Sequence, residues 1–381
     1  MSAPATTLPD IIAHAKEYGF VFPSSEIYDG LQAVYDYGQN GVELKNNLKN
    51  AWWKAMTQLN DNIVGIDASI FMHPLTWKAS GHLDGFNDPM IDNKDSKKRY
   101  RADQLLEGKA EILLNEGNEE ASKALLAKMG KLLTDEDLDA VRELIIEEGI
   151  VCPVSKTANW TEVRQFNLMF STQIGSVADD SSKIYLRPET AQGIFVNFLN
   201  VQKSGRMKIP FGISQIGKAF RNEIVARQFI FRMREFEQME MQFFVRPGTE
   251  GEWYDQWKAT RLNFHKALGM PAESLKFHDH DKLAHYANAA VDIEYKFPFG
   301  FREMEGIHSR TDFDLKNHQE LSRKKQQYFD PNIDPETNKP YGNYIPFVIE
   351  TSLGADRLFL ATLCNSFTKE MVGEADKQKE R

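Results

Sequence analysis

Strict alternation of side-chain character between Gln228 and Phe244 constrains the fold of this chain more than any other feature. Successive side chains of a β-strand point to opposite faces, so a period of two sustained over such a length predicts a strand with two distinct faces. One face is apolar except at Glu235 and Glu237, and it carries Phe229, Phe231, Met233, Met239, Met241 and Phe243. The other face is mostly polar, and it carries Arg232, Arg234, Phe236, Gln238, Glu240 and Gln242.

The polar face has the composition of a binding site. In a generic hairpin such a stripe simply faces water, but here Phe236 interrupts it and its charges have both signs. The preceding segment, 216–223, predicts a neighbouring strand that adds Arg221 and Glu223 to one face. Arginines can bind phosphate oxygens in pairs, an aromatic ring can stack on a base, and carboxylates can hold an ammonium group or a metal ion. Together these residue types indicate a site for a nucleotide and an amino acid.

Composition limits the classes of protein to which the chain can belong. With 41% hydrophobic and 27% charged residues among 381, the sequence is typical of a globular protein. A net charge of −9 argues against a generally sticky nucleic-acid or membrane binder, although it leaves room for a local basic groove. The two cysteines, Cys152 and Cys364, form no CxxC pair, which excludes a disulfide framework and a cysteine-rich zinc site. No signal peptide or membrane-spanning run is visible, and we expect a cytoplasmic protein with no membrane partner.

The residue patterns divide the chain into three parts. Residues 1–100 mix aromatics and glycines with one strong helical pattern, and they predict the first part of a larger domain. Residues 101–150 place apolar side chains at spacings of three and four, which predicts a small helical insert. Residues 151–381 return to β-branched and aromatic runs punctuated by Gly and Pro, which is typical of an antiparallel sheet with a few helices. We therefore expect an α+β fold.

Three segments resemble, in the right order, the signature motifs of class II aminoacyl-tRNA synthetases. Motif 1 would be the helix Asn46–Met56 with a strand ending at Pro74, motif 2 would be FRNE at Phe220–Glu223 with REF at Arg234–Phe236, and motif 3 would be Tyr344–Leu363. Each motif alone is a weak pattern, and the combination is specific. The resemblance implies a class II catalytic domain, built on an antiparallel sheet flanked by helices.

The resemblance extends to one amino-acid specificity. Segments spread over residues 18–365 are similar to the dimeric type of glycyl-tRNA synthetase, among them TWKASGHLDGFNDPMIDNK, YLRPETAQGIF and EGIHSRTDFDL. RPETAQG at Arg187–Gly193 and FEQME at Phe236–Glu240 point to glycine. This implies an ATP-dependent glycine–tRNA ligase that forms glycyl-adenylate and transfers glycine to the 3′ end of tRNA(Gly). It also implies a homodimer in which the motif 1 helix and strand supply much of the contact.

Two functions of other classes fit parts of the sequence. A stand-alone synthetase paralogue would activate an amino acid for a carrier other than tRNA, and only the lack of sequence after motif 3 favours it. A regulatory module that had lost the chemistry would be expected to lack the arginines, yet Arg221, Arg234 and Arg357 are all present. We therefore favour the ligase.

The resemblance assigns the residues that would activate ATP. Activation joins the amino-acid carboxylate to the α-phosphate, so preorganised cations aimed at phosphate oxygens are the main requirement. Arg221 would bridge the α-phosphate and the substrate carboxylate, while Phe236 and Arg357 would cover the two faces of the adenine. Glu303 is the candidate Mg²⁺ ligand, because this ion prefers one or two carboxylates with phosphate oxygens and water. The expected catalytic residues are Arg221, Arg357 and Glu303, and the expected ATP-binding residues are Arg221, Asn222, Glu223, Phe231, Arg232, Arg234, Phe236, Glu303, Met304, Gly354 and Arg357.

Glycine offers only an ammonium group and a carboxylate, so its recognition must match charges and exclude bulk. By resemblance, Glu189 and Glu240 hold the ammonium group and Ser352 adds a polar contact. A structural role is the alternative for Arg101, because it borders the helical insert. The expected glycine-binding residues are Arg101, Glu189, Phe236, Gln238, Glu240, Arg310, Glu350 and Ser352.

The sequence departs from the family pattern at three places. Thr351 stands where motif 3 more commonly has a proline, which loosens a turn without changing a contacting residue. Some relatives carry cysteines around Asp92–Lys97, consistent with a metal site, and this chain has none there, so we predict no zinc. The family usually continues past motif 3 into an anticodon-binding domain, and we expect a chain that ends at Arg381 to be a truncated form. Its tRNA contacts would then lie near the acceptor end, in the motif 2 loop, where Arg227 is the one cation.

Overall fold

The computed structural model describes residues 7–175, 182–224, 228–280, 283–284, 286–372 and 379–380. Arg227 lies outside these described residues. The chain forms two compact units. The first comprises Met1–Ser80, Phe170–Arg221 and Ala226–Arg381, and the second comprises Gly81–Met169 and Asn222–Val225.

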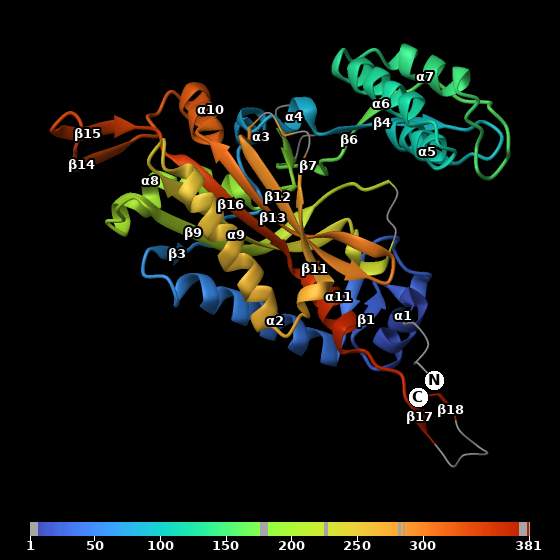
Figure 1. Cartoon of the computed structure of the whole chain (residues 1–381), viewed down its shortest axis with the longest axis horizontal. Coiled ribbons are helices and arrows are strands. Elements are labelled where there is room, and N and C mark those ends of the chain that lie inside the picture. The colour runs from blue at the N-terminus through green and yellow to red at the C-terminus, as the bar shows by residue number, and fades with distance from the viewer. Residues whose placement is uncertain are drawn as a thin grey trace. The chain divides into compact units, whose positions relative to one another are not determined.

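The first unit is built around one large β-sheet (Figure 1). The strands of this sheet are β3 (Ile63–Gly65), β9 (Phe211–Phe220), β10 (Glu235–Val245), β11 (Leu275–Asp279), β12 (Ala289–Phe297), β13 (Gly300–Thr311) and β16 (Phe347–Gly354). Its helices are α1 (Leu8–Glu17), α2 (Gln39–Thr57), α3 (Pro74–Ala79), α8 (Ala191–Ser204), α9 (Glu250–Ala267), α10 (Phe313–Ser322) and α11 (Ala355–Ser366), with the 3₁₀ helices η1 (Glu26–Tyr28), η3 (Phe229–Phe231) and η4 (Ala272–Ser274). Smaller hairpins pair β1 (Val21–Pro23) with β2 (Tyr35–Tyr37), β7 (Ser171–Gln173) with β8 (Lys183–Tyr185), β14 (Tyr328–Asp334) with β15 (Lys339–Tyr344), and β17 (Met371–Val372) with β18 (Lys379–Glu380).

The strand order of the large sheet is β11-β12-β13-β16-β10-β9-β3. All neighbouring pairs are antiparallel except β3 and β9, which run parallel. The predicted antiparallel sheet flanked by helices is therefore confirmed. The long strands β9, β10 and β16, from the predicted motifs 2 and 3, are adjacent, so the sheet brings these distant segments side by side.

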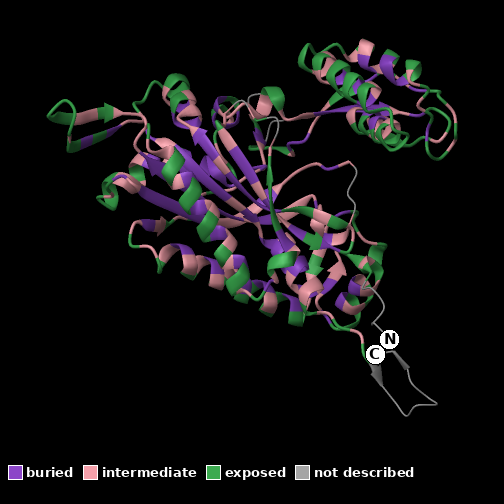
Figure 2. Cartoon of the chain, viewed as in Figure 1, coloured by how far each residue is buried: buried purple, intermediate pink, exposed green. Residues whose placement is uncertain are grey.

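The two faces of β10 pack as the alternation predicts. Met239, Met241 and Phe243 lie in the main hydrophobic core, to which α2, α9 and α11 also contribute side chains. Phe244, on the other face, packs against Phe198 of α8 with ring centroids 4.6 Å apart. The strands of the sheet are largely buried, whereas the outward sides of the helices are exposed (Figure 2).

Two charged residues interrupt the apolar face of β10, and Glu237 is neutralised from α2. Lys49 Nζ lies 2.6 Å from Glu237 Oε1 and Lys45 Nζ lies 3.0 Å from Oε2. Burial alone would raise the pKa of Glu237, but the two lysines outweigh it and hold that pKa below its ordinary value. The partially exposed Glu235 pairs with Lys218 of β9 at 2.8 Å. Both carboxylates can therefore lie on the otherwise apolar face of β10, because each has a cationic partner.

The structure corrects the predicted strand boundaries. The segment from Gln228 is not strand at first, because Phe229–Phe231 form the 3₁₀ helix η3 and β10 begins only at Glu235. Phe231 packs edge-on against Phe297, the last residue of β12, and against Phe299, so its apolar character serves packing although Phe231 is not in a strand. The motif 1 strand is β3 and ends at Gly65, whereas Pro74 begins α3 at a position that tolerates a missing N–H.

The second unit joins helices to a small sheet. Its helices are α4 (His82–Gly85), α5 (Ala102–Asn115), α6 (Glu119–Thr134) and α7 (Leu138–Glu147), and its strands β4 (Asn87–Asp92), β5 (Arg99–Arg101) and β6 (Arg164–Asn167) are ordered β5-β4-β6. Leu106, Leu144 and Ile145 are buried in one cluster with Trp160. This unit is wider than residues 101–150, because the strands that flank the helices belong to it as well.

Candidate active site

The register of three central strands assembles a polar surface on one face of the sheet. The paired positions are Gln238 with Gly354, Glu240 with Ser352, Gln242 with Glu350, Gly306 with Ser352, and His308 with Glu350. Residues that pair directly across strands lie on the same face. The polar stripe predicted from β10 alone is therefore extended by β16 and β13 into a continuous surface.

Glu350 is the centre of a buried network on this surface. Its Oε2 accepts hydrogen bonds from Arg310 Nη1 at 2.9 Å and from Gln242 Nε2 at 2.7 Å, and its Oε1 accepts from His308 Nδ1 at 2.8 Å. Arg310 also donates through Nε and Nη2 to the two oxygens of Asp314, at 2.9 and 3.1 Å. Burial favours the neutral form, but Arg310 and His308 outweigh it and hold the pKa of Glu350 below its ordinary value. Glu350 is therefore a charged carboxylate with several donors.

Glu240 is equally buried but has the opposite electrostatic setting. Its Oε2 accepts a hydrogen bond from Thr190 Oγ1, and its Oε1 accepts one from Gln242 Nε2 at 3.0 Å. Neither donor is charged. Burial, together with the charges of Glu350 and Glu189, raises the pKa of Glu240 well above its ordinary value. A ligand with a positive charge would supply what this carboxylate lacks.

The segment that leads into α8 completes the network. Thr190 donates through its backbone N to Gln238 Oε1 at 3.1 Å, and Gln238 Nε2 donates to Ser352 Oγ at 3.3 Å. Gln192 Nε2 donates both to Glu189 Oε1 at 3.0 Å and to Asp314 Oδ1 at 2.9 Å. The structure thus joins six of the predicted glycine-binding residues through shared hydrogen bonds: Glu189, Gln238, Glu240, Arg310, Glu350 and Ser352.

Arg221 and Phe236 form a cation–aromatic pair beside this network. Arg221 follows the last residue of β9, and its guanidinium carbon lies 5.2 Å from the ring centroid of Phe236. Its Nε donates to the carbonyl oxygen of Pro188 at 3.0 Å, which fixes the side chain. The planar guanidinium group of an arginine suits a carboxylate or a phosphate.

A second cation–aromatic pair is formed by Arg357 and Phe231. The guanidinium carbon lies 4.4 Å from the ring centroid, and Nη1 lies 3.0 Å from Glu303 Oε2. The charge of Arg357 is the main reason that the pKa of Glu303 is lowered. Gly354 lies beside this arginine, and a Cβ there would make an ordinary van der Waals contact with Arg357 Cγ at 3.4 Å. Glu303 keeps half of its side chain exposed, so its carboxylate is accessible to a ligand.

Three other predicted ATP-binding residues occupy different settings. Met304 has its side chain in the hydrophobic core, with 1% exposed. Arg234 is tied to the segment before β2, because its backbone N donates to Ala33 O at 2.9 Å and its Nη1 to Gln32 O at 3.2 Å. Arg232 is partially exposed at the end of η3.

The remaining predicted site residues, Arg101, Asn222 and Glu223, belong to the second unit. Within it, Arg101 lies 3.0 Å from Asp88 and 2.6 Å from Asp103, so its charge is already paired. Glu223 is buried and its charge acts on Arg101. The backbone N of Asn222 donates to Leu168 O at 2.8 Å.

Sequence reasoning did not single out several members of the network, namely Thr190, Gln192, His308 and Asp314. Signals for all four were present. Thr190 and Gln192 lie inside RPETAQG, and His308 and Asp314 lie inside EGIHSRTDFDL. Gln242 was placed on the polar face but without a role. Their polar side chains, inside segments that already resembled the family, could therefore have marked these four residues as candidates for the site.

Comparisons with known proteins agree with this geometry. The family model of the tRNA synthetase class II core domain (G, H, P, S and T) matches residues 170–333, and that of the glycyl-tRNA synthetase insertion domain 1 matches residues 88–126 and 116–168. The glycine–tRNA ligase of Chlorobaculum tepidum is 55% identical over 364 residues, which cover 95% of this chain and 76% of that protein. The glycine–tRNA ligase of Staphylococcus aureus is 54% identical over 370 residues, with 97% and 76% covered.

No helix among the described residues has the length and apolar character needed to cross a membrane. The predicted family is confirmed by the matches to both family models and by relatives that are more than 50% identical to the chain over the aligned residues. The chain therefore belongs to the glycyl-tRNA synthetase family, within the class II aminoacyl-tRNA synthetases.

Proposed function

We propose that this chain activates glycine with ATP at the polar surface of the sheet and transfers the glycyl group to the 3′ end of tRNA(Gly). The overall reaction is inferred from membership of the family, and its other products are AMP and diphosphate. The observation that supports this particular surface is the joining of Glu189, Glu240 and Ser352 in one network, with Arg221 fixed on Phe236 beside it.

The glycine subsite is proposed to be electrostatic. Glu240 and Glu189 would bind the ammonium group, because Glu240 is a buried carboxylate whose hydrogen-bond donors are neutral. Gln238 and Ser352 would add polar contacts. Glu350 and Arg310 neutralise one another and would hold the walls of the subsite in place rather than bind the ammonium directly. A subsite with walls fixed by hydrogen bonds would also disfavour a larger amino acid, since forcing an extra methyl into a packed region costs about 1–3 kcal/mol.

The ATP subsite is proposed to lie along the two cation–aromatic pairs. Phe236 would stack on the adenine and Arg357 would cover its other face and approach the γ-phosphate. Arg221 would contact both the α-phosphate and the glycine carboxylate, holding the two reacting groups together. The carboxylate oxygen then attacks the α-phosphorus and diphosphate leaves. Arg221 would stabilise the negative charge that develops on the phosphate oxygens.

Glu303 is the proposed ligand of Mg²⁺. Its half-exposed carboxylate beside Arg357 fits the preference of this ion for one or two carboxylates with phosphate oxygens and water. When bound, Mg²⁺ would neutralise charge on the phosphates. Arg357 would hold the Glu303 carboxylate in its ionised form.

The proposed oligomeric state and cellular compartment are those expected from the resemblance and the composition. We propose a two-fold homodimer whose contacts come largely from α2 and β3, acting in the cytoplasm. On α2, Trp52 is fully buried while Trp53 packs over Gly65, where a Cβ would lie 2.2 Å from the indole. Both cysteines are free thiols, which suits a reducing compartment. A monomeric mass by light scattering at micromolar concentration would contradict the dimer.

The activity is tested in two steps. ATP–diphosphate exchange should be stimulated by glycine and far less by alanine, with the reaction lacking an amino acid as the baseline. Mixing the protein with tRNA and radiolabelled glycine should then label the tRNA. Exchange that ignores glycine would overturn the proposed subsite. Activation without any labelling of tRNA would instead favour a carrier other than tRNA.

A further inference from the structure

Two histidines and an aspartate gather at the neighbouring strands β11, β12 and β13 of the large sheet, and one of them, His308, also belongs to the network. His280 follows β11, Asp292 lies on β12 and His308 lies on β13. The Nε2 atom of His280 is 2.8 Å from Asp292 Oδ2, and one ligand atom from each of the three side chains lies within 4.8 Å of the other two. The register places these side chains together, because Ala290 pairs with His308 and Asp292 pairs with Gly306.

The three side chains have the chemistry of a transition-metal site. Two imidazoles and one carboxylate are ligands that Zn²⁺ and related divalent ions bind well, whereas Mg²⁺ prefers oxygen ligands only. In a tetrahedral zinc site with metal–ligand distances of about 2.0–2.2 Å, neighbouring ligand atoms lie about 3.3 Å apart. The observed separations bracket this distance, so small side-chain rotations would bring all three atoms onto one ion.

His308 is already oriented as a metal ligand would be. Its Nδ1 donates to Glu350 Oε1 at 2.8 Å, which leaves Nε2 as the nitrogen with a lone pair. A carboxylate on the far ring nitrogen is the usual second partner of a metal-bound histidine, because it fixes the tautomer and the ring orientation. A Cβ at Gly306 would lie 3.2 Å from His308 Nε2 and 3.5 Å from Asp292 Oδ1, so both atoms border the space that this glycine leaves empty.

His280 is the member whose bonding is incomplete. Its Nε2 has no hydrogen-bond partner among the residues that the structure describes, although Asp292 Oδ2 is 2.8 Å away. This close contact between the imidazole nitrogen and the carboxylate oxygen brings two candidate ligand atoms together. The side chain as a whole is 31% exposed, whereas the Nε2 atom itself is buried.

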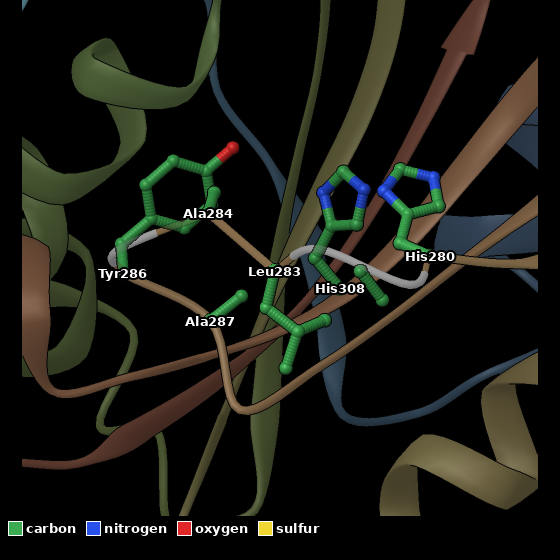
Figure 3. A pocket seen from close by; sticks show the side chains of 7 residues that line it. His280, Leu283, Ala284, Tyr286, Ala287 and His308 are labelled. Atoms are coloured by element: carbon green, nitrogen blue, oxygen red, sulfur yellow. The ribbon is translucent and has the colours of Figure 1, made fainter. Parts of the chain in front are cut away.

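A cavity of about 360 Å³ opens onto both histidines. Figure 3 shows their imidazole rings side by side at one end of it, with Tyr286 at the other, and the ring centroids are 5.9 Å apart. The other lining residues are apolar: Leu283, Ala284, Ala287 and Ala290. The cavity provides an entry path, and it leaves room for a water molecule as a further ligand.

We propose that His280, Asp292 and His308 bind one divalent transition-metal ion, with Zn²⁺ as the probe that best matches these ligands. The three ligands do not include Glu303, the proposed Mg²⁺ ligand, although the charge of Glu303 acts on Asp292, and the proposal does not depend on the proposed function. It departs from the prediction of no zinc, which considered cysteine ligands only. Through the Nδ1 of His308, a bound ion would be linked to Glu350 and hence to the glycine network.

Titration calorimetry tests the site on the full chain after dialysis against a chelator. Zn²⁺ should bind with one ion per chain, and an excess of Mg²⁺ should not displace it. His280→Gln and Asp292→Asn should each weaken binding by more than about tenfold, because they remove ligands rather than outer partners. His278→Gln is the matched control, since His278 is also near the end of β11 but lies 3.5 Å from Glu294 and outside the cluster.

The outcomes distinguish a specific metal site from non-specific binding. Selective weakening by His280→Gln and Asp292→Asn, with His278→Gln unchanged, supports the proposal. Absence of Zn²⁺ binding, or equal weakening by all three variants, overturns it. Because His280 is partially exposed, its variant should remain folded, and circular dichroism of each variant verifies this. Unchanged Zn²⁺ binding by a folded His280→Gln variant also overturns the proposal.

Discussion

The Nζ atom of Lys45, on α2, lies 2.7 Å from Oδ1 of Asp356, on α11, and both side chains are nearly inaccessible to water. Tyr37 also donates to Asp356 Oδ1, and the backbone N of Glu237 donates to Oδ2 at 2.7 Å. This cluster ties together the helix of motif 1, the second strand of motif 2 and the helix of motif 3. Two members of the cluster are sequence neighbours of site residues, because Asp356 precedes Arg357 and Glu237 follows Phe236. The cluster therefore fixes the backbone at both positions.

Replacing Asp356 by Asn should therefore lower the free energy of unfolding by about 1–3 kcal/mol, because Lys45 would lose the nearer of its two buried charge partners and keep only Glu237. Urea denaturation followed by circular dichroism measures this. Glu119→Gln is the control, since Glu119 pairs with Lys123 on the exposed surface of α6 and such pairs contribute little. Equal stability of the two variants would show that the cluster is not a stabilising element.

Arg221→Ala should reduce glycine-dependent ATP–diphosphate exchange by about 10²–10³-fold, the usual loss when one preorganised donor to a developing charge is removed. Arg206→Ala is the matched control, because Arg206 is exposed and follows α8, away from the network. The measured quantity is the exchange rate at saturating ATP. A rate within tenfold of the wild type would remove Arg221 from the proposed role.

Glu240→Gln and Glu189→Gln should each raise the KM for glycine by about ten- to a hundredfold, because a hydrogen bond to a charged group is worth about 1.5–3 kcal/mol. The KM for ATP should change little, since ATP has no ammonium group. Glu235→Gln serves as the control from the same strand, because Glu235 lies on the other face and pairs with Lys218. A parallel rise in both KM values would assign these carboxylates to holding the sheet together.

The sequence was sufficient for those parts of the site that depend on local spacing. Alternation placed Met239 and Met241 in the core and Gln238 and Glu240 on the polar face, and the structure confirms both. It overextended the strand at Phe231, because an apolar residue at the right spacing can equally pack from a short helix, as Phe231 does against Phe297 of β12.

Long-range pairing could not be read from spacing. Arg310 and Glu350 are 40 positions apart, and Lys45 and Asp356 are 311 apart. Nothing in either local pattern identifies the partner, since each pair is brought together only by the strand order and the helix packing. The resemblance placed Arg310 and Glu350 in one pocket, but it did not predict that they neutralise one another. Lys45 and Asp356 received no role from the sequence at all.

Glycine binding should release a proton from Glu240. In the free protein, burial and the charges of Glu350 and Glu189 raise the pKa of Glu240 well above its ordinary value, which favours the protonated form. An ammonium group bound at Glu240 favours the ionised form and therefore lowers this pKa. Between the bound and the free pKa values the complex holds fewer protons than the free protein, so the affinity for glycine should rise with pH there and level off above the free value.

Calorimetry of glycine binding in two buffers with different ionisation enthalpies measures the released proton. Glu240→Gln should abolish the release, because an amide does not titrate in this range, whereas Glu235→Gln should leave it intact. Proton uptake by the wild type, or a release that persists in Glu240→Gln, would show that the ammonium group is bound elsewhere.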